Sequence, residues 1–210
     1  MSELAIEKPS KPAEHAAWER HFWLPMLGRS AAGLTVSKWE WLGRWLFVGL
    51  LVAAAPVVLL RNIRDGGSDF WEYYTAGRYL LEHGARQPNS ILAYYWPSLD
   101  VAWAGLAWMP LEIAAAVWYL IGCWCWIGLL RAVGCYLLPG LVETQKRQTV
   151  LAAGLLVMPI AILHMCLGAF HILMLWWMVA GLGRVSRGRH FSGGILLGLA
   201  VWVKLLPLLG

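Results

Sequence analysis

Residues 45–60 read Trp-Leu-Phe-Val-Gly-Leu-Leu-Val-Ala-Ala-Ala-Pro-Val-Val-Leu-Leu, and this apolar run decides the class of fold. Arg44 precedes the run, and Arg61 and Arg64 follow it. With Trp41 and Leu42 added, it approaches the ~20 helical residues that cross ~30 Å of hydrocarbon. We therefore predict a first membrane-spanning helix at this position.

The composition of the whole chain agrees with a membrane protein. Of its 210 residues, 60% are hydrophobic and only 14% are charged, and the mean hydropathy is +0.58. A soluble domain is about half apolar and about a quarter charged. The net charge of +5 is carried beside apolar runs, where basic residues set topology, so we expect no nucleic-acid partner.

The four cysteines lie in apolar runs or at their edges. The two-residue spacing of Cys123 and Cys125 directs their thiols to different faces of a helix. We interpret all four as packing residues, and we expect neither a metal site nor any other cofactor.

Upstream of the first span, residues 1–44 are polar and of mixed charge. They lack the short apolar core and small-residue cleavage site of a secretory signal peptide. We interpret them as a cytoplasmic N-terminal tail, with an interfacial helix around Trp18–Leu27.

Downstream of the first span, residues 61–97 form a hydrophilic segment. A Gly-containing turn at Asp65–Ser68 precedes a short amphipathic helix, Phe70–Leu81, which His83-Gly84 ends. A second group of aromatic residues, Tyr94-Tyr95-Trp96-Pro97, closes the segment.

The rest of the chain alternates between apolar runs and basic connections. Leu99–Met109 is too short to cross and is expected to be a re-entrant or interfacial helix. Leu111–Leu130 is predicted to be a full span. Thr149–Leu163 and Phe170–Gly183 are predicted to be the short arms of a hairpin whose tip lies at residues 164–169. Phe191–Gly210 is predicted to be a last helix. The fold class is therefore all-α, a polytopic membrane bundle with about five apolar spans and one short helix.

The basic residues predict an orientation for this bundle. With the N-terminus in the cytoplasm, the inside segments hold 12 Lys and Arg residues and the outside segment 61–98 holds four. This distribution follows the positive-inside rule. Asp69, the histidines of the hairpin tip (His164 and His171) and Lys204 then face the extracytoplasmic side, where we expect them to share a cavity.

These residue types suit transfer of a sugar from a lipid phosphate. A carboxylate such as Asp69 deprotonates an acceptor hydroxyl, and Lys204 or His171 stabilises a departing phosphate. Aromatic rings stack on sugars, and Tyr73, Tyr74 and Tyr95 are available for this.

Each residue also has a structural explanation. Asp69 and Glu72 have the spacing of a helix capping box. His171 fits a buried, hydrogen-bonded histidine, and Lys204 fits a residue that extends to the membrane interface. The tyrosines fit an interfacial aromatic belt.

Four stretches in order carry a resemblance to a known family. They are Asp69-Phe70-Trp71-Glu72-Tyr73-Tyr74-Thr75-Ala76-Gly77; Tyr95-Trp96-Pro97 with Met109-Pro110-Leu111 and Ala116-Val117-Trp118; Gly168-Ala169-Phe170-His171 with Arg187-Gly188-Arg189; and Gly194–Ala200 with Lys204 and Pro207. The set resembles glycosyltransferase family 87, membrane enzymes of the GT-C type related to polyprenol-phosphate-mannose-dependent mannosyltransferases. It departs from the family at Ala169 and His171, where a Gln and an Asn are usual.

The resemblance implies a GT-C-like helical bundle and an inverting hexosyltransferase. Asp69 would be its base, and Lys204 would contact the donor phosphate. Residues 45–210 are then expected to be the N-terminal part of a longer transmembrane domain, truncated at its C-terminus and inactive alone.

The expected partners are a polyprenyl-phosphate sugar donor, a lipid or glycan acceptor and membrane lipids, in the plasma membrane with the active site outside. The alternative is a non-enzymatic polytopic membrane protein, either a transporter fragment or an assembly subunit. In that case Asp69 only caps a helix and Lys204 only anchors the chain at the interface.

Overall fold

The computed structural model describes residues 38–64, 68–88, 97–168 and 170–204, and for Pro97, Ser98 and Lys204 the backbone only. Residues 1–41 form a separate unit from residues 42–210, and the arrangement given below is that of the second unit. The predicted N-terminal tail and its interfacial helix, Trp18–Leu27, lie outside the described residues, as does Tyr95.

The described residues contain helices and no strands. The helices are α2 (Lys38–Arg64), α3 (Asp69–His83), α4 (Pro97–Ala107), α5 (Leu111–Tyr136), α6 (Glu143–Leu167), α7 (His171–Val185) and α8 (His190–Lys204). By length and composition, α2, α5 and α6 are able to cross a membrane, while α7 and α8 are shorter apolar helices. The predicted all-α fold of about five apolar helices with short additional helices is confirmed.

Helices α5 and α6 extend beyond their predicted ends, and α2 extends beyond both of its predicted ends. Helix α5 continues past Arg131 to Tyr136, and α6 begins at Glu143 instead of Thr149. The polar first turns of α6 are helical because Glu143 lies 3.6 Å from Lys146 Nζ and 3.5 Å from Arg147 Nε, at helical spacing. The prediction of two short hairpin arms is therefore wrong for α6, which has 25 residues, and holds for α7, which has 15.

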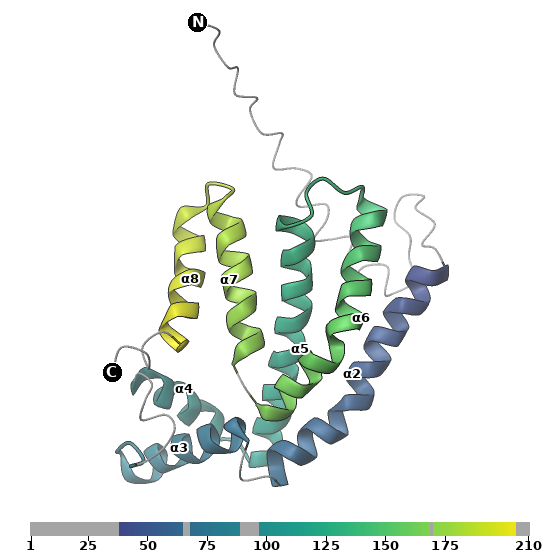
Figure 1. Ribbon diagram of the computed structural model, residues 1–210. Coiled ribbons are helices and arrows are strands. Elements are labelled where there is room, and N and C mark those ends of the chain that lie inside the picture. The colour runs from purple at the N-terminus through teal and green to yellow at the C-terminus, as the bar shows by residue number, and fades with distance from the viewer. Residues whose placement is uncertain (1–37, 65–67, 89–96, 169, 205–210) are drawn as a thin grey trace, which may run out of the picture. The chain divides into compact units, whose positions relative to one another are not determined.

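The connections of this unit lie at two ends (Figure 1). The α5–α6 and α7–α8 connections lie at one end, and α3, α4 and the α6–α7 connection lie at the other. Helix α6 contains Pro159 and bends in its C-terminal part, as expected of a proline that removes a backbone hydrogen bond. Helix α7 packs against α5 and α8, and α3 packs against α4.

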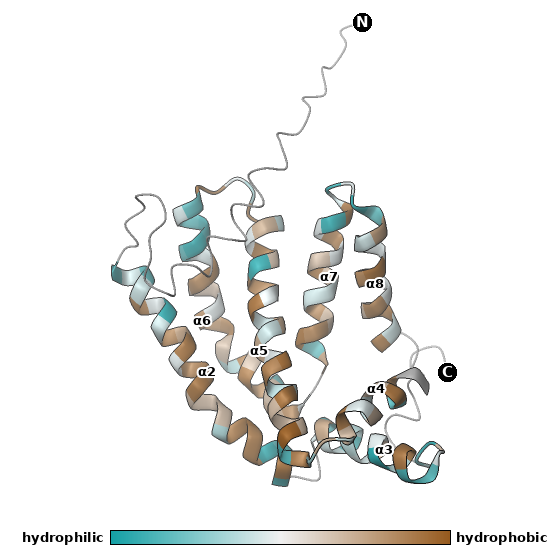
Figure 2. Ribbon diagram, turned by 180° about the vertical axis from the view of Figure 1, so that it is seen from behind, coloured by the Kyte–Doolittle hydropathy of each residue, from teal (hydrophilic) through white to brown (hydrophobic). Residues whose placement is uncertain are grey.

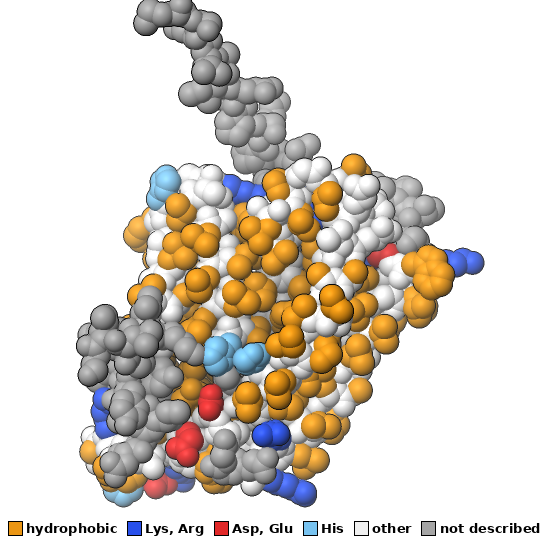
Figure 3. Space-filling model, viewed as in Figure 1, with side chains coloured by type: hydrophobic (Ala, Val, Ile, Leu, Met, Phe, Trp, Pro, Cys, Tyr) orange, Lys and Arg blue, Asp and Glu red, His pale blue; other side chains and the backbone are white. Residues whose placement is uncertain are grey.

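Hydropathy also differs between the middle of this unit and its two ends (Figure 2). Hydrophobic residues occupy the middle of the long helices, and hydrophilic residues lie toward their ends. The face shown in Figure 3 is rich in hydrophobic side chains, and histidine, acidic and basic side chains lie both toward the end that carries α3 and at the opposite end. A surface of this kind suits lipid in the middle of the unit and water at its ends.

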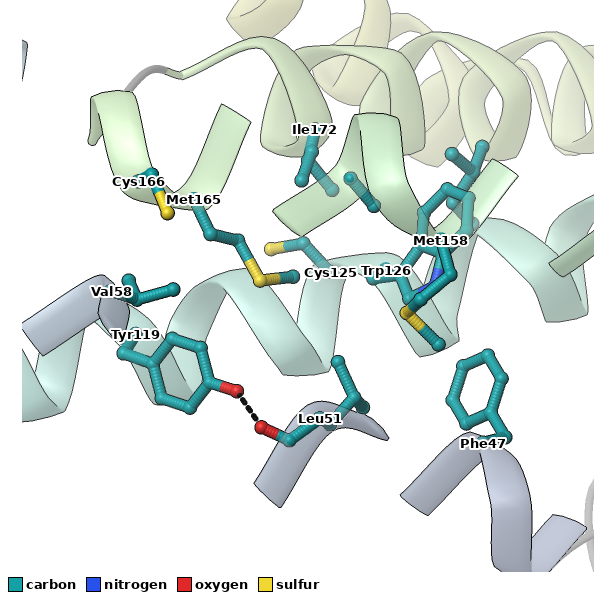
Figure 4. Close-up of a cluster of buried hydrophobic side chains, with 12 residues drawn as sticks. Phe47, Leu51, Val58, Tyr119, Cys125, Trp126, Met158, Met165, Cys166 and Ile172 are labelled. Atoms are coloured by element: carbon teal, nitrogen blue, oxygen red, sulfur yellow. Dashed lines mark hydrogen bonds between the residues drawn. The ribbon is translucent and has the colours of Figure 1, made fainter. Parts of the chain in front are cut away.

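A hydrophobic core joins α2, α5 and α6, with Ile172 of α7 (Figure 4). The Tyr119 hydroxyl, which is buried in this core, donates a hydrogen bond to the carbonyl of Leu51. A polar group at this depth needs such a partner because hydrocarbon offers none. Cys125 and Cys166 are buried in the same core, as expected of packing residues.

Candidate active site

Ser68, and not Asp69, caps helix α3. The Ser68 side chain accepts a hydrogen bond from the Trp71 backbone N–H at 3.2 Å, and its backbone is extended, as an N-cap requires. Asp69 is the first helical residue, and it is partly exposed. The capping explanation of Asp69 and Glu72 is therefore wrong, and the Asp69 carboxylate is not needed to cap the helix.

A cluster of five aromatic rings includes Phe70, the residue after Asp69, and combines different parts of the chain. Trp103 is central to it, because its ring contacts the other four, and the Tyr73 ring centroid lies 5.0 Å from those of both Trp103 and Phe170. Trp118 lies 4.7 Å from Trp103 and 5.3 Å from Phe170. This aromatic cluster, completed by Phe70, joins α3, α4 and α5 to the residue before α7.

Helix α3 lies flat against α4 because Gly77 has no side chain. A Cβ on Gly77 would stand 2.6 Å from the backbone carbonyl of Trp103, which is closer than atoms pack. The Tyr74 hydroxyl adds a hydrogen bond of 2.9 Å to the Met109 carbonyl. The two helices therefore form a fixed platform at this end of the unit.

The end of α6 touches the start of α3. Gly168 adopts a left-handed conformation (φ 69°) that ends α6, which favours glycine. A Cβ at this position would lie 2.7 Å from the Phe70 backbone nitrogen. The Trp118 indole N–H donates to the Gly168 carbonyl at 3.1 Å and fixes this contact.

Two histidines meet beside this contact. His164 lies in the last turn of α6, and His171 is the first residue of α7. Their ring centroids are 4.9 Å apart. Since His171 is exposed, its explanation as a buried histidine is wrong.

Lys204 is the last residue of α8. Its neighbour Val203 is buried against the aromatic cluster, so the backbone of Lys204 reaches the same end of the unit as Asp69 and His171. The Lys204 side chain, Ala169 and Tyr95 lie outside what the structure describes, and the role of each stays a prediction. The expected shared cavity also stays a prediction.

The two described tyrosines have structural contacts of their own. The ring of Tyr73 is only 2% exposed, which favours packing, while Tyr74 is partly exposed and anchors the segment before α5. Contact of either residue with a substrate stays a prediction.

Sequence reasoning missed two features of this end. Trp103 connects the platform to Phe170 and to Trp118, and only Trp118 stood in a motif that the sequence singled out. Asp100 of α4 is buried and forms an ion pair with Arg86. Burial raises the pKa of the Asp100 carboxyl above its ordinary value, and the Arg86 charge partly opposes this shift.

Within the described ranges, no group of three or more His, Cys, Asp or Glu residues is placed to hold a metal ion. The described side chains at this end supply a carboxylate, two imidazoles and aromatic rings.

Comparison with known proteins gives one match. The model of glycosyltransferase family 87 matches residues 94–210, which include α4 to α8. Asp69 precedes the matched range, and the packing of α3 on α4 connects it to that range. No curated protein and no solved structure matches the chain.

Proposed function

The chain belongs to glycosyltransferase family 87, and we propose that it transfers a hexose from a polyprenyl-phosphate donor to an extracytoplasmic lipid or glycan acceptor. Mannose is the first sugar to test. The observation that carries the proposal is the aromatic cluster. It packs Phe70, the residue after Asp69, together with Phe170, the residue before His171, and Val203, the residue before Lys204.

Asp69 is the proposed general base. Its carboxylate takes the proton of the acceptor hydroxyl while the acceptor oxygen bonds to the anomeric carbon of the sugar. The bond from that carbon to the phosphate oxygen breaks, and the phosphate leaves with the electron pair. The capping role of Ser68 supports this assignment, since Asp69 is then available for chemistry.

Lys204 and His171 are the proposed contacts of the departing phosphate. A cation or an N–H donor there stabilises the negative charge that develops as the bond breaks. Tyr74 and Tyr95 are the proposed sugar contacts, and Tyr73 packs within the aromatic cluster. Donor, acceptor and inversion at the anomeric carbon all belong to this proposal.

The test uses the complete protein, purified in detergent, with a polyprenyl-phosphate-mannose donor and a panel of lipid acceptors. We expect Asp69→Asn to lower turnover by about 100-fold or more, the usual contribution of a general base. Glu72→Gln, three residues further along α3, is the matched control and should retain turnover. Unchanged turnover in Asp69→Asn would refute the base assignment, and a complete protein that transfers no sugar from this donor would favour the non-enzymatic alternative.

The proposed orientation has a separate test. Arg78 of α3 and Arg187 of the α7–α8 connection are both exposed and lie at opposite ends of the unit. In a cysteine-free background, a cysteine at position 78 should react with a membrane-impermeant maleimide in intact cells. A cysteine at position 187 should react only after permeabilisation, and the reverse pattern would refute this orientation.

A further inference from the structure

His164 and His171 come from two different helices and form one pair of rings. Their interplanar angle is 49° and their centroids are 4.9 Å apart. The pair lies beside the contact of Gly168 with Phe70, the residue after Asp69.

The backbone on either side of the hairpin turn is held in place. Asn62, which is fully buried at the end of α2, donates its side-chain N–H to the Met165 carbonyl at 3.3 Å. Trp118 holds the Gly168 carbonyl in the same way. The pair therefore stands on a fixed backbone, which is what a preorganised binding site requires.

The pair offers hydrogen-bond donors to an anion. A neutral imidazole carries one N–H, which can donate a hydrogen bond to an anion. His164 Nδ1 is buried and has no hydrogen-bond partner within the described part of the chain. His171 lies where the N–H groups of α7 emerge, and the N-cap Phe170 provides no side-chain hydrogen bond to them.

We propose that His164 and His171 together form a binding site for one phosphate group. Phosphate oxygens accept hydrogen bonds from imidazole, and helix N-termini favour anions. Resting on the proposed function, we assign this phosphate to the lipid-linked donor, and His164 is then a second ligand-binding residue beside His171. A metal ion is the competing ligand of an imidazole pair, but the described residues supply no third ligand.

Binding to the purified full chain tests the site directly. The probes are farnesyl phosphate, inorganic phosphate and farnesol, and the dissociation constant is measured from ³¹P NMR or by thermophoresis. The variants His164→Phe and His171→Phe keep the ring and remove its N–H. Each variant should weaken the binding of both phosphate probes about tenfold, the usual effect of losing one hydrogen bond to a charged group.

His190→Phe is the matched control, since His190 is the exposed first residue of α8 as His171 is of α7. It should leave both affinities unchanged. His171→Asn restores an N–H donor and should recover part of the affinity. Tighter binding of farnesyl phosphate than of inorganic phosphate supports the lipid-linked ligand.

Three binding results would overturn the proposal: equal phosphate affinity in His164→Phe and the parent, farnesol binding as tightly as farnesyl phosphate, or pair-dependent Zn²⁺ binding without phosphate binding. The proposed function fails differently. Phosphate binding that needs both histidines, in a complete protein that transfers no sugar, would refute the transferase and retain the site. Sugar transfer that is unaffected by either histidine variant would refute the site and retain the transferase.

Discussion

Gly168 lies directly against Phe70, so that a Cβ on Gly168 would stand 2.4 Å from the Phe70 Cβ. This contact joins the end of α6 to the start of α3, one residue from the proposed base. The position of the proposed base therefore depends on Gly168 and Phe70, which carry no reactive group.

Gly168→Ala should destabilise the protein and reduce sugar transfer. The left-handed backbone costs a non-glycine residue ~1–2 kcal/mol, and the new methyl group must displace Phe70 at further cost. Gly188→Ala is the control, because Gly188 has φ 74° but open space around its Cβ position. Thermal unfolding in detergent should show a clearly larger loss for Gly168→Ala, and equal losses would contradict the contact.

Gly77→Ala should separate α3 from α4. Its methyl group would meet the Trp103 backbone, which cannot move aside as a side chain does, and we expect a loss of about 1–3 kcal/mol. Gly105→Ala, on the exposed side of α4 with open space around it, should be neutral or stabilising by up to about 1 kcal/mol. A thermal unfolding series that ranks the two variants in the opposite order would refute this packing.

Ser68→Ala should cost about 1 kcal/mol of stability, the usual value for loss of an N-cap. Asp69→Asn should leave stability nearly unchanged, because Asp69 does not cap α3. Ser192→Ala removes a weaker hydroxyl contact near the start of α8 and serves as the control. The assignment of the cap would be wrong if Asp69→Asn lowered the unfolding temperature and Ser68→Ala did not.

Trp118→Phe should retain most of the ring packing and lose the hydrogen bond to the Gly168 carbonyl. We expect a loss of about 1 kcal/mol together with reduced sugar transfer, since the hairpin tip is held less firmly. Trp124→Phe, on the exposed surface of the same helix, should change neither. Thermal unfolding and turnover, measured side by side, would show no difference between the two variants if this hydrogen bond were unimportant.

Asp100 should make stability depend on pH. Because burial raises its pKa in the folded state, the folded protein holds a proton that the unfolded chain has already released. Stability should therefore fall as pH rises from the ordinary aspartate pKa through the raised one. Asp100→Asn should remove this fall, and Arg86→Gln should extend it to higher pH, as unfolding temperatures measured across pH 4–7 would show.

The sequence predicted the kinds of helices better than their ends. The apolar run before Arg131 predicts a span that ends at this arginine. In the structure, α5 continues to Tyr136. A helix does not end where its surroundings change from lipid to water, because its hydrogen bonds are internal in both. Polarity therefore marks a boundary between solvents, while caps such as Gly168 mark the boundary of the helix.

The residues of the candidate site were likewise only partly predictable from the sequence. Asp69 and His171 stood out by residue type and by family resemblance. Trp103 and Asp100 did not, because an apolar or acidic residue on a short helix reveals its importance only through its neighbours. Ser68 was overlooked as a cap because the spacing of Asp69 and Glu72 offered a competing pattern, and only the backbone geometry separated the two.

The sequence by itself determined that this is an all-helical membrane protein of a glycosyltransferase family, because hydropathy and ordered motifs are properties of local stretches. Only the tertiary structure decided which residues meet. The proximity of Gly168 to Phe70, of His164 to His171 and of Val203 to the aromatic cluster joins segments far apart in the chain. Such contacts arise from the packing of whole helices, and packing depends on shapes that no single stretch contains.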